Sequence, residues 1–316
     1  MITELKAREI VALIKKVGEY EAKKALGVTA DSFSRYLRII RNFYNIPFED
    51  DPLDANVKIL VFDIESAPSK AWTFRRWKVN ISQDMIQSEG YLLCYAAKWL
   101  GDKDIIVDAL PFYDGYTAGS EDDSAVVKSL HNLISKADIV IAHNAKGFDI
   151  PLFNTRALTH GLMPPKPYKI VDTLKVAKAQ FKFPSNKLDS IGSYLGLGRK
   201  TEHEGFKLWV GCMDGVKEAW DKMIEYNEQD VSLLESVYLK LRPWDSMHPA
   251  MDVYSHSGVM RCKACGSTDL TEHDFVYTHV SAYTSHQCNS CGHWNRGRKN
   301  QRSREQMQNT LMNVAR

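Results

Sequence analysis

The fold is decided by one stretch of the sequence, Lys58-Ile59-Leu60-Val61-Phe62-Asp63-Ile64-Glu65. Its apolar run predicts a buried strand. The strand ends in Asp63 and Glu65, and because side chains alternate along a strand, these two acids lie on the same face. The packing of a buried strand does not need two carboxylates, so the pair predicts a functional site.

Two later segments carry acids at comparable positions. The apolar run 137–144 predicts a second strand, and Pro151 suits the first turn of the helix that follows, so Asp149 is expected at the junction between strand and helix. Tyr226 and Asp230 open a later helical run. They are four residues apart and therefore share one face of that helix.

Each acid has an ordinary explanation when it is taken singly. Glu65 fits a solvated strand end, Asp149 a helix cap, and Tyr226 with Asp230 a surface pair. Together, however, Asp-x-Glu, Asn-x-x-x-Phe-Asp and Tyr-x-x-x-Asp follow one another in an order that resembles the three motifs of the DEDD superfamily of 3′→5′ exonucleases. The tyrosine marks the DEDDy form, which is found in proofreading domains of family-B DNA polymerases and in stand-alone exonucleases of bacteriophages.

This resemblance implies a metal-dependent nuclease with two Mg²⁺ or Mn²⁺ ions, since paired divalent ions activate water and neutralise the leaving oxygen, and carboxylates are the ligands that these hard cations prefer. By resemblance, Asp63 bridges the ions, and Glu65 and Asp230 complete the site of the ion that activates water. Asp149 holds the second ion through water, and Tyr226 orients the attacking water.

The order of the expected elements fits an α/β fold class: a ribonuclease-H-like mixed sheet flanked by helices. Further strands are expected at 91–100 and 104–110, and a helix at 123–136. The predicted domains are a helix-turn-helix-like helical domain at 1–46, the exonuclease domain at 57–243, a zinc ribbon at 258–296, and a basic tail at 297–316 that is expected to be mobile.

Four of the six cysteines form two Cys-x-x-Cys pairs that are separated by 22 residues, a spacing typical of a structural zinc site. One zinc ion is therefore expected, bound by Cys262, Cys265, Cys288 and Cys291. A pair of disulfides is the alternative. The chain begins without the apolar core of a signal peptide, which favours a reducing compartment and hence zinc.

The first fifty residues predict helices at 5–17 and 19–26, a turn at Gly27, and a third helix. This pattern is similar to a helix-turn-helix, with Arg35 and Arg38 on the exposed face as candidate contacts to DNA. The alternative is a small helical bundle that packs on another domain or on another protein.

Other candidate contacts to nucleic acid lie in the nuclease segment. Trp72 and Trp77 flank two arginines directly after the first strand, where aromatic rings would stack on bases. A place in the core is the alternative for both. Asn144, the first residue of the second motif, and Lys187 are further candidates. Asp172 is expected to be a helix cap and not a fifth metal ligand.

Composition restricts the remaining function classes. The chain has 316 residues, 44% hydrophobic content and a net charge of +2, so nucleic acid would be bound by local patches, not by a uniformly basic surface. No apolar run is long enough to span a membrane. We therefore expect a cytoplasmic protein, in the host cytoplasm if a bacteriophage encodes it, whose partner is nucleic acid, in the first place DNA. A replication or repair protein is a candidate partner.

The sequence therefore predicts a 3′→5′ exonuclease that acts on DNA and is targeted by DNA-binding accessory modules. An RNA exonuclease or a structure-selective nuclease is the alternative among enzymes, because this fold hosts both. A DNA-binding regulator that retains an inactive nuclease-like domain is the alternative from another class.

Overall fold

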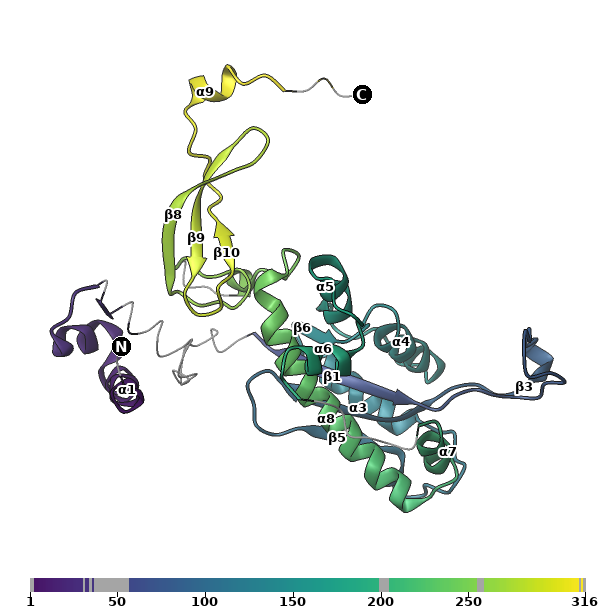
Figure 1. Cartoon of the computed structure of the whole chain (residues 1–316). Coiled ribbons are helices and arrows are strands. Elements are labelled where there is room, and N and C mark those ends of the chain that lie inside the picture. The colour runs from purple at the N-terminus through teal and green to yellow at the C-terminus, as the bar shows by residue number, and fades with distance from the viewer. Residues whose placement is uncertain are drawn as a thin grey trace. The chain divides into compact units, whose positions relative to one another are not determined.

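The computed structural model describes residues 3–30, 32–33, 36, 57–198, 205–254, 259–312 and 314. The chain divides into two compact units, whose helices and strands are drawn in Figure 1. One unit is Val57–Pro249, and the other combines Met1–Asn56 with Ala250–Arg316.

Five strands of the first unit form one mixed sheet in the order β5-β4-β1-β6-β7. Strand β1 pairs antiparallel with β4 and parallel with β6, while β4 pairs antiparallel with β5 and β6 parallel with β7. This is the predicted ribonuclease-H-like sheet, and each strand expected from the sequence is present. The bounds are β1 Ile59–Ser66, β4 Leu92–Trp99, β5 Ile106–Ala109, β6 Ile139–Ala142 and β7 Lys169–Asp172.

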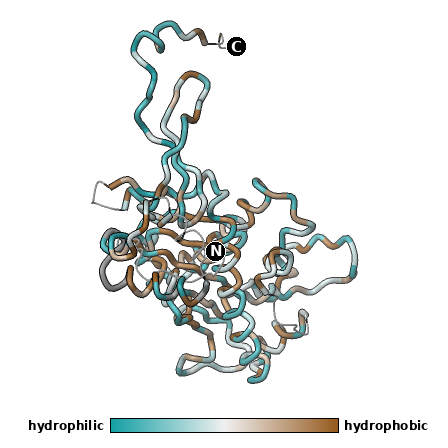
Figure 2. Tube along the Cα trace, turned by 60° about the vertical axis from the view of Figure 1, so that its left-hand side comes forward, coloured by the Kyte–Doolittle hydropathy of each residue, from teal (hydrophilic) through white to brown (hydrophobic). Residues whose placement is uncertain are grey.

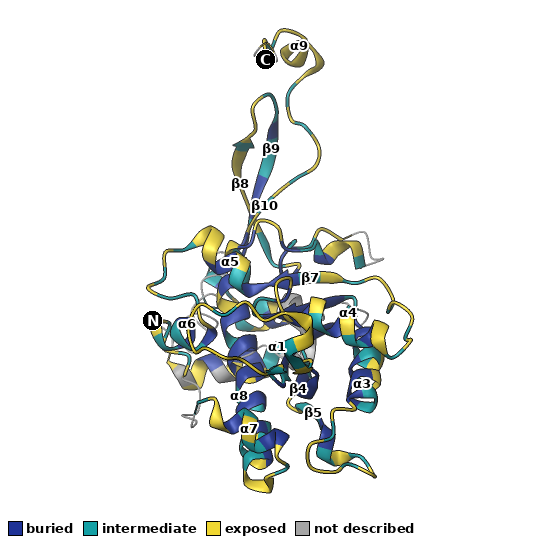
Figure 3. Ribbon diagram, turned by 90° about the vertical axis from the view of Figure 1, so that its right-hand side faces the viewer, coloured by how far each residue is buried: buried dark blue, intermediate teal, exposed yellow. Residues whose placement is uncertain are grey.

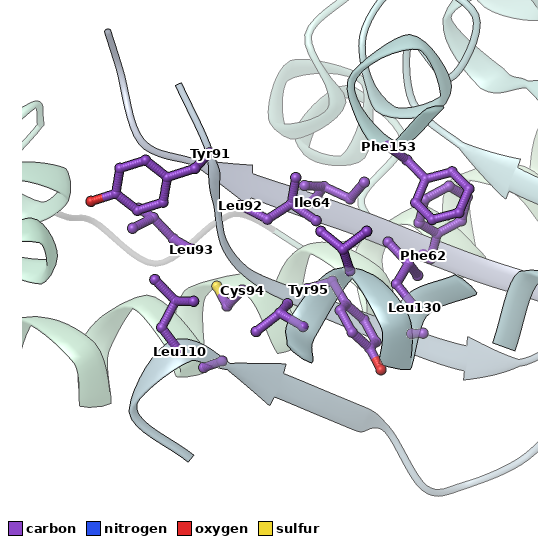
Figure 4. Close-up of a cluster of buried hydrophobic side chains, with 14 of the residues drawn as sticks. Phe62, Ile64, Tyr91, Leu92, Leu93, Cys94, Tyr95, Leu110, Leu130 and Phe153 are labelled. Atoms are coloured by element: carbon purple, nitrogen blue, oxygen red, sulfur yellow. The ribbon is translucent and has the colours of Figure 1, made fainter. Parts of the chain in front are cut away.

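Helices cover this sheet, and the alternation of side chains along β1 assigns them to its two faces. Phe62 and Ile64 belong to the apolar cluster that includes Leu130 of α3 and Phe153 of α4 (Figure 4). Asp63, which alternates with them, is contacted instead by helix α8. The helices are α3 Ser124–Ile134, α4 Asp149–Thr159, α5 Thr173–Gln180, α6 Leu188–Tyr194, α7 Lys207–Met213 and α8 Lys217–Leu241.

Burial follows this layering. The central strands β1, β4 and β6 and the inward faces of the helices are mostly buried, and most exposed residues lie on the outer faces of the helices and in the loops (Figure 3). Short 3-10 helices lie at Gln83–Met85, Leu110–Phe112, Arg242–Trp244 and Met251–Tyr254. A small hairpin of β2 Lys70–Ala71 and β3 Ile86–Ser88 follows β1.

The N-terminal segment differs from the sequence prediction. Glu4–Leu26 is one continuous helix, α1, where two helices were expected. Gly18 does not interrupt it, because a glycine inside a helix costs only about 1 kcal/mol. The helix ends at Gly27, which has φ 63° as a left-handed cap, as the turn predicted. Phe33 packs on Ala22, so the next segment folds back on α1.

The C-terminal residues form a second sheet, in the order β10-β9-β8. We call it the C-terminal sheet. Its strands are β8 Leu270–Tyr277, β9 Ala282–Cys288 and β10 Trp294–Arg296, and a short helix, α9 Arg304–Gln308, follows.

The segment expected to be a mobile tail is mostly hydrophilic (Figure 2). Its first part is hydrogen-bonded to the C-terminal sheet. The amides of Gly297 and Gln301 donate to the carbonyls of Thr284 and Ala282, both at 2.8 Å. The Arg302 guanidinium donates to the carbonyl oxygen of Val280 at 2.9 Å.

Candidate functional site

Three carboxylates from two distant segments meet on the face of the sheet that α8 covers. Asp63 and Glu65 come from β1, and Asp230 comes from the middle of α8. Their ligand oxygens all lie within 4.8 Å of one another. Like charges at this distance repel in the absence of a cation, so the arrangement fits a site for divalent ions.

Helix α8 is fixed against the sheet by polar contacts at its C-terminal half. Glu235 forms an ion pair with Lys98 of β4 and accepts a hydrogen bond from the Gly101 amide at 3.0 Å. Closer to the triad, the Asn227 amide donates to Oδ2 of Asp63 at 2.8 Å, and Asn227 is fully buried. These contacts set the register that brings Asp230 to β1.

Glu65 is held by a tryptophan that sequence reasoning did not single out. The indole Nε1 of Trp209, in α7, donates to Oε2 of Glu65 at 3.2 Å. The same indole makes an edge-to-face contact with Tyr226, with ring centroids 6.2 Å apart. Tyr226 is 7% exposed and lies one helical turn before Asp230. Trp209 therefore links the tyrosine to the carboxylate cluster.

The sequence contained only weak signals for these two supporting residues. Asn227 directly follows the motif tyrosine, and Trp209 is a residue with a polar indole nitrogen in an apolar run. Both act through side-chain contacts between segments that are distant in sequence. Local periodicity does not report such contacts.

Asp149 is not part of the three-carboxylate cluster, but it lies beside β1. It is the first residue of α4, is 1% exposed, and neither carboxylate oxygen has a hydrogen-bond partner. Burial raises the pKa of Asp149 to about 7; the nearby backbone amides of Asp149 itself and of Ile64 oppose this rise, although neither is placed to form a hydrogen bond with the carboxylate.

The helix-cap explanation for Asp149 is therefore wrong, because the cap position is occupied by Phe148 and Asp149 makes no capping hydrogen bond. A buried carboxylate that lacks hydrogen bonds is costly unless a cation compensates it. This environment fits the predicted ligand of a second ion.

The loop between β6 and α4 is shaped by Asn144 and Asp172. Asn144 adopts a left-handed conformation with φ 74°, and its backbone amide donates to Oδ1 of Asp172 at 3.1 Å. Gly147 packs closely on it, since a Cβ there would lie 2.5 Å from Oδ1 of Asn144. Asp172 caps α5 by accepting from the amides of Leu174 and Lys175, which confirms the predicted cap.

The remaining candidate contacts to nucleic acid are surface residues or lie outside the described part of the chain. Trp72 and Trp77 are 73% and 83% exposed, so the alternative that places them in the core is wrong. Lys187 is exposed at the start of α6. Arg35 and Arg38 lie outside the described residues.

The four cysteines of the C-terminal segment form a second cluster. Sγ of Cys262 lies 3.7 Å from that of Cys291, and Sγ of Cys265 lies 3.6 Å from that of Cys288. All four cysteines are free, and the two distances match the separation of about 3.8 Å that tetrahedral zinc with Zn–S bonds near 2.3 Å requires. The alternative of two disulfides is wrong, and the cluster fits Zn²⁺.

Backbone and amide groups support this cluster. Gly266 and Gly292 have φ 80° and 82°, and their amides donate to the carbonyls of Cys262 and Cys288. The Asn295 side-chain amide lies 3.6 Å from Sγ of Cys262 and donates towards it. Such turns direct the four thiolates to one point.

Comparison with known proteins supports the fold. Residues 101–242 match a family described as the RNase_H superfamily. A search of curated proteins found no match. Among solved structures, the family B DNA polymerase from the hyperthermophilic archaeon Pyrobaculum calidifontis is similar with 17% sequence identity and a TM-score of 0.45, over 60% of this chain and 25% of the polymerase.

The chain thus spans a quarter of that polymerase. The family match begins after β1, so Asp63 and Glu65 lie before the matched segment while Asp149, Tyr226 and Asp230 lie within it. The ribonuclease-H-like fold and the acidic triad together indicate a nuclease. No helix in the described part of the chain is both long and apolar enough for a membrane span.

Proposed function

We propose that this chain is a 3′→5′ exonuclease that hydrolyses phosphodiester bonds in DNA with two Mg²⁺ or Mn²⁺ ions. The observation that carries the proposal is the convergence of Asp63, Glu65 and Asp230 within 4.8 Å, with Tyr226 one turn away on the same helix. The buried Asp149 supports a second ion close to the same strand. The direction of digestion rests on the DEDDy motif pattern.

Each side chain of the site is proposed to have its own role in this reaction. Asp63, Glu65 and Asp230 would hold the ion next to the attacking water, with Asp63 shared between both ions. Asp149 would hold the second ion. Bound divalent ions supply a nucleophilic water at neutral pH and neutralise charge on the leaving oxygen. Tyr226 would orient the water, and Trp209 and Asn227 would keep the carboxylates in place through the contacts described above.

The hairpin after β1 is proposed to contact the nucleic acid strand. It begins four residues beyond Ser66, the last residue of β1, and exposes Trp72, Phe74 and Trp77 next to the cations Arg75 and Arg76. Exposed rings stack on bases, and neighbouring cations contact phosphates. Asn144 and Lys187 are proposed as further contacts. The N-terminal helices, with Arg35 and Arg38, are proposed to bind duplex DNA and target the nuclease.

A digestion experiment tests the proposal. The pure protein is incubated with DNA or RNA, single- or double-stranded and labelled at the 5′ or the 3′ end, with Mg²⁺, Mn²⁺ or chelator. Stepwise shortening of 5′-labelled DNA, dependent on metal, is expected. Stepwise shortening of RNA alone would replace DNA as the substrate. Internal cuts would indicate a structure-selective nuclease, and no cleavage of any substrate would favour the regulator with an inactive domain.

A further inference from the structure

The two faces of the C-terminal sheet carry different side chains. Residues directly opposite on antiparallel strands point to the same face. Ser285 lies opposite both His273 and Arg296, and Gln287 lies opposite Trp294. His273, Trp294 and Arg296 therefore share one face, which Tyr283 joins because it is two residues from Ser285 on β9. We call these four residues the aromatic–basic face.

The zinc-binding cysteine cluster belongs to the other face. Cys288, one residue from Gln287, alternates to that side and pairs with Leu270. Asn295, between Trp294 and Arg296, likewise directs its amide to Cys262. The aromatic–basic face is thus not needed to enclose the metal, and its composition calls for another explanation.

The side chains of the aromatic–basic face contact one another in pairs and remain accessible. The rings of His273 and Trp294 have centroids 4.8 Å apart, and the Arg296 guanidinium carbon lies 4.3 Å from the Tyr283 ring centroid. Trp294 is nevertheless 55% exposed, and His273 and Arg296 are exposed. These contacts order the rings and the guanidinium while leaving them accessible to a partner.

The segment that contains Trp294 and Arg296 is basic. The segment 294–304 contains five cations and no acid. Of these, Arg296, Arg298, Lys299 and Arg304 are exposed. Glu272 lies opposite His286 and therefore on the other face of the sheet. An anionic polymer with flat rings is the partner that this combination fits.

We propose that the aromatic–basic face binds single-stranded DNA, with bases stacked on Trp294 and on the Arg296–Tyr283 pair and phosphates contacted by the neighbouring cations. Single strands fit better than duplexes because their bases are open for stacking. Every base has a ring face, so binding is expected with little sequence preference. This proposal rests on the proposed function, since the aromatic–basic face would give the nuclease a second binding site for the substrate or product strand.

A binding experiment on the full chain tests this proposal. Every protein in the experiment carries Asp63→Ala and Asp230→Ala, which are introduced so that the DNA is not digested during the measurement. Fluorescence anisotropy then measures the affinity for a labelled oligothymidylate over a series of salt concentrations. Trp294→Ala is expected to weaken binding roughly tenfold to a hundredfold, and Trp294→Phe to restore most of the affinity. Arg296→Ala with Arg298→Ala should reduce the salt dependence.

Tyr277→Ala is the matched control. Tyr277 is 73% exposed on β8 and lies opposite Ala282, on the other face of the sheet. Zinc content in each variant checks that the C-terminal sheet is folded. The proposal is overturned if Trp294→Ala binds oligothymidylate as tightly as Tyr277→Ala does, or if Trp294→Phe is as weak as Trp294→Ala.

The outcome separates this surface from the proposed function, because binding is measured in protein that cannot cleave. If Trp294→Ala loses binding while the wild-type protein digests no nucleic acid, the binding surface is supported and the exonuclease is refuted. If Trp294→Ala binds normally while the wild-type protein digests DNA, the exonuclease is supported and the binding surface is refuted. A protein would then be the remaining candidate partner for this face.

Discussion

The unit at Val57–Pro249 and the C-terminal sheet with its cysteines each contain a cluster of side chains that could bind metal ions. The two clusters differ in what surrounds them. The first domain has an apolar core that runs from β1 through α3 and α4, and its carboxylates lie at one edge of that core. The buried cluster around β8, β9 and β10 consists of Cys262, Ala264, Cys265 and Cys288, with Leu270 and Cys291 packed on it. In the C-terminal sheet the ligands themselves form the core.

One kind of site is thus added to a fold that is stable without it, whereas the other kind stabilises its own fold. An apolar core supplies folding free energy whether or not a metal is bound, so acids next to it can be selected for chemistry. A few small residues around four thiols supply little, so a metal ion bound by the four cysteines would have to contribute the rest.

Zinc removal is therefore expected to have the largest effect. Cys262→Ser with Cys288→Ser should remove a binding contribution of about 10 kcal/mol or more and unfold the C-terminal sheet. Protease sensitivity of residues 259–312 and zinc content measure this. Hydrolysis of short single strands should survive in part, also after deletion of residues 260–316. Absence of zinc from wild-type protein purified without chelator would end the distinction between the two clusters.

Loss of an acidic ligand should have the opposite effect: hydrolysis is lost while folding is retained. Asp63→Ala or Asp230→Ala is expected to lower the rate of DNA hydrolysis by more than about a thousandfold, since a metal ion supplies several kcal/mol of transition-state stabilisation. The unfolding midpoint should not fall, because the core is intact. Asp102→Ala, at an exposed acid beyond β4, is the control. Unfolding of the Asp63→Ala protein would contradict this.

The stability of the first unit should depend on pH through Asp149. The folded pKa of Asp149 is raised to about 7 by burial, whereas an unfolded aspartate titrates near 3.9. Between these values the folded protein without Mg²⁺ or Mn²⁺ binds more protons, so its stability falls as pH rises from about 4 to about 7. Asp149→Asn should remove this fall, which amounts to about 4 kcal/mol at most.

Urea unfolding of both proteins across this pH range measures the effect. Divalent ions should offset the fall in the wild type only. Parallel curves for the wild type and Asp149→Asn would show that Asp149 is not a buried acid awaiting a cation.

The supporting residues should have smaller effects. Asn227→Ala removes the hydrogen bond to Asp63 and is expected to raise the Mg²⁺ concentration for half-maximal activity roughly tenfold to a hundredfold. The rate at saturating Mg²⁺ should change less. Ser232→Ala, at an exposed position on the same helix, is the control. An unchanged metal requirement would make Asn227 a packing residue.

The mildest change is expected for Tyr226→Phe. Only the hydroxyl is lost, and one hydrogen bond to an oriented water corresponds to a slowing of about tenfold. The Mg²⁺ requirement should stay the same, which separates this variant from Asn227→Ala in a metal titration. A rate equal to that of the wild type would make the tyrosine structural.

Much of this could be predicted from the sequence, because the signals are local. Strand β1, the turn at Gly27 and the cap at Asp172 follow from periodicity and turn chemistry within a few residues. The prediction of two N-terminal helices was wrong because a weak local preference at Gly18 did not decide whether the helix continued. The exposure of Trp72 and Trp77 was not decided by the sequence either, since aromatic residues are common in cores and on binding surfaces alike.

The residue types and their spacing can be read from the sequence alone: two acids on one strand face, a tyrosine and an acid on one helix face, and two Cys-x-x-Cys pairs. The folded structure was needed to show that α8 crosses β1 so that Asp230 meets Asp63 and Glu65. It was also needed to show that Trp209 and Asn227 hold these acids and that Asp149 is buried without a hydrogen bond. The physical reason is that spacing is fixed along the chain, whereas burial and the meeting of distant segments depend on how the sheet is ordered and which helices cover it.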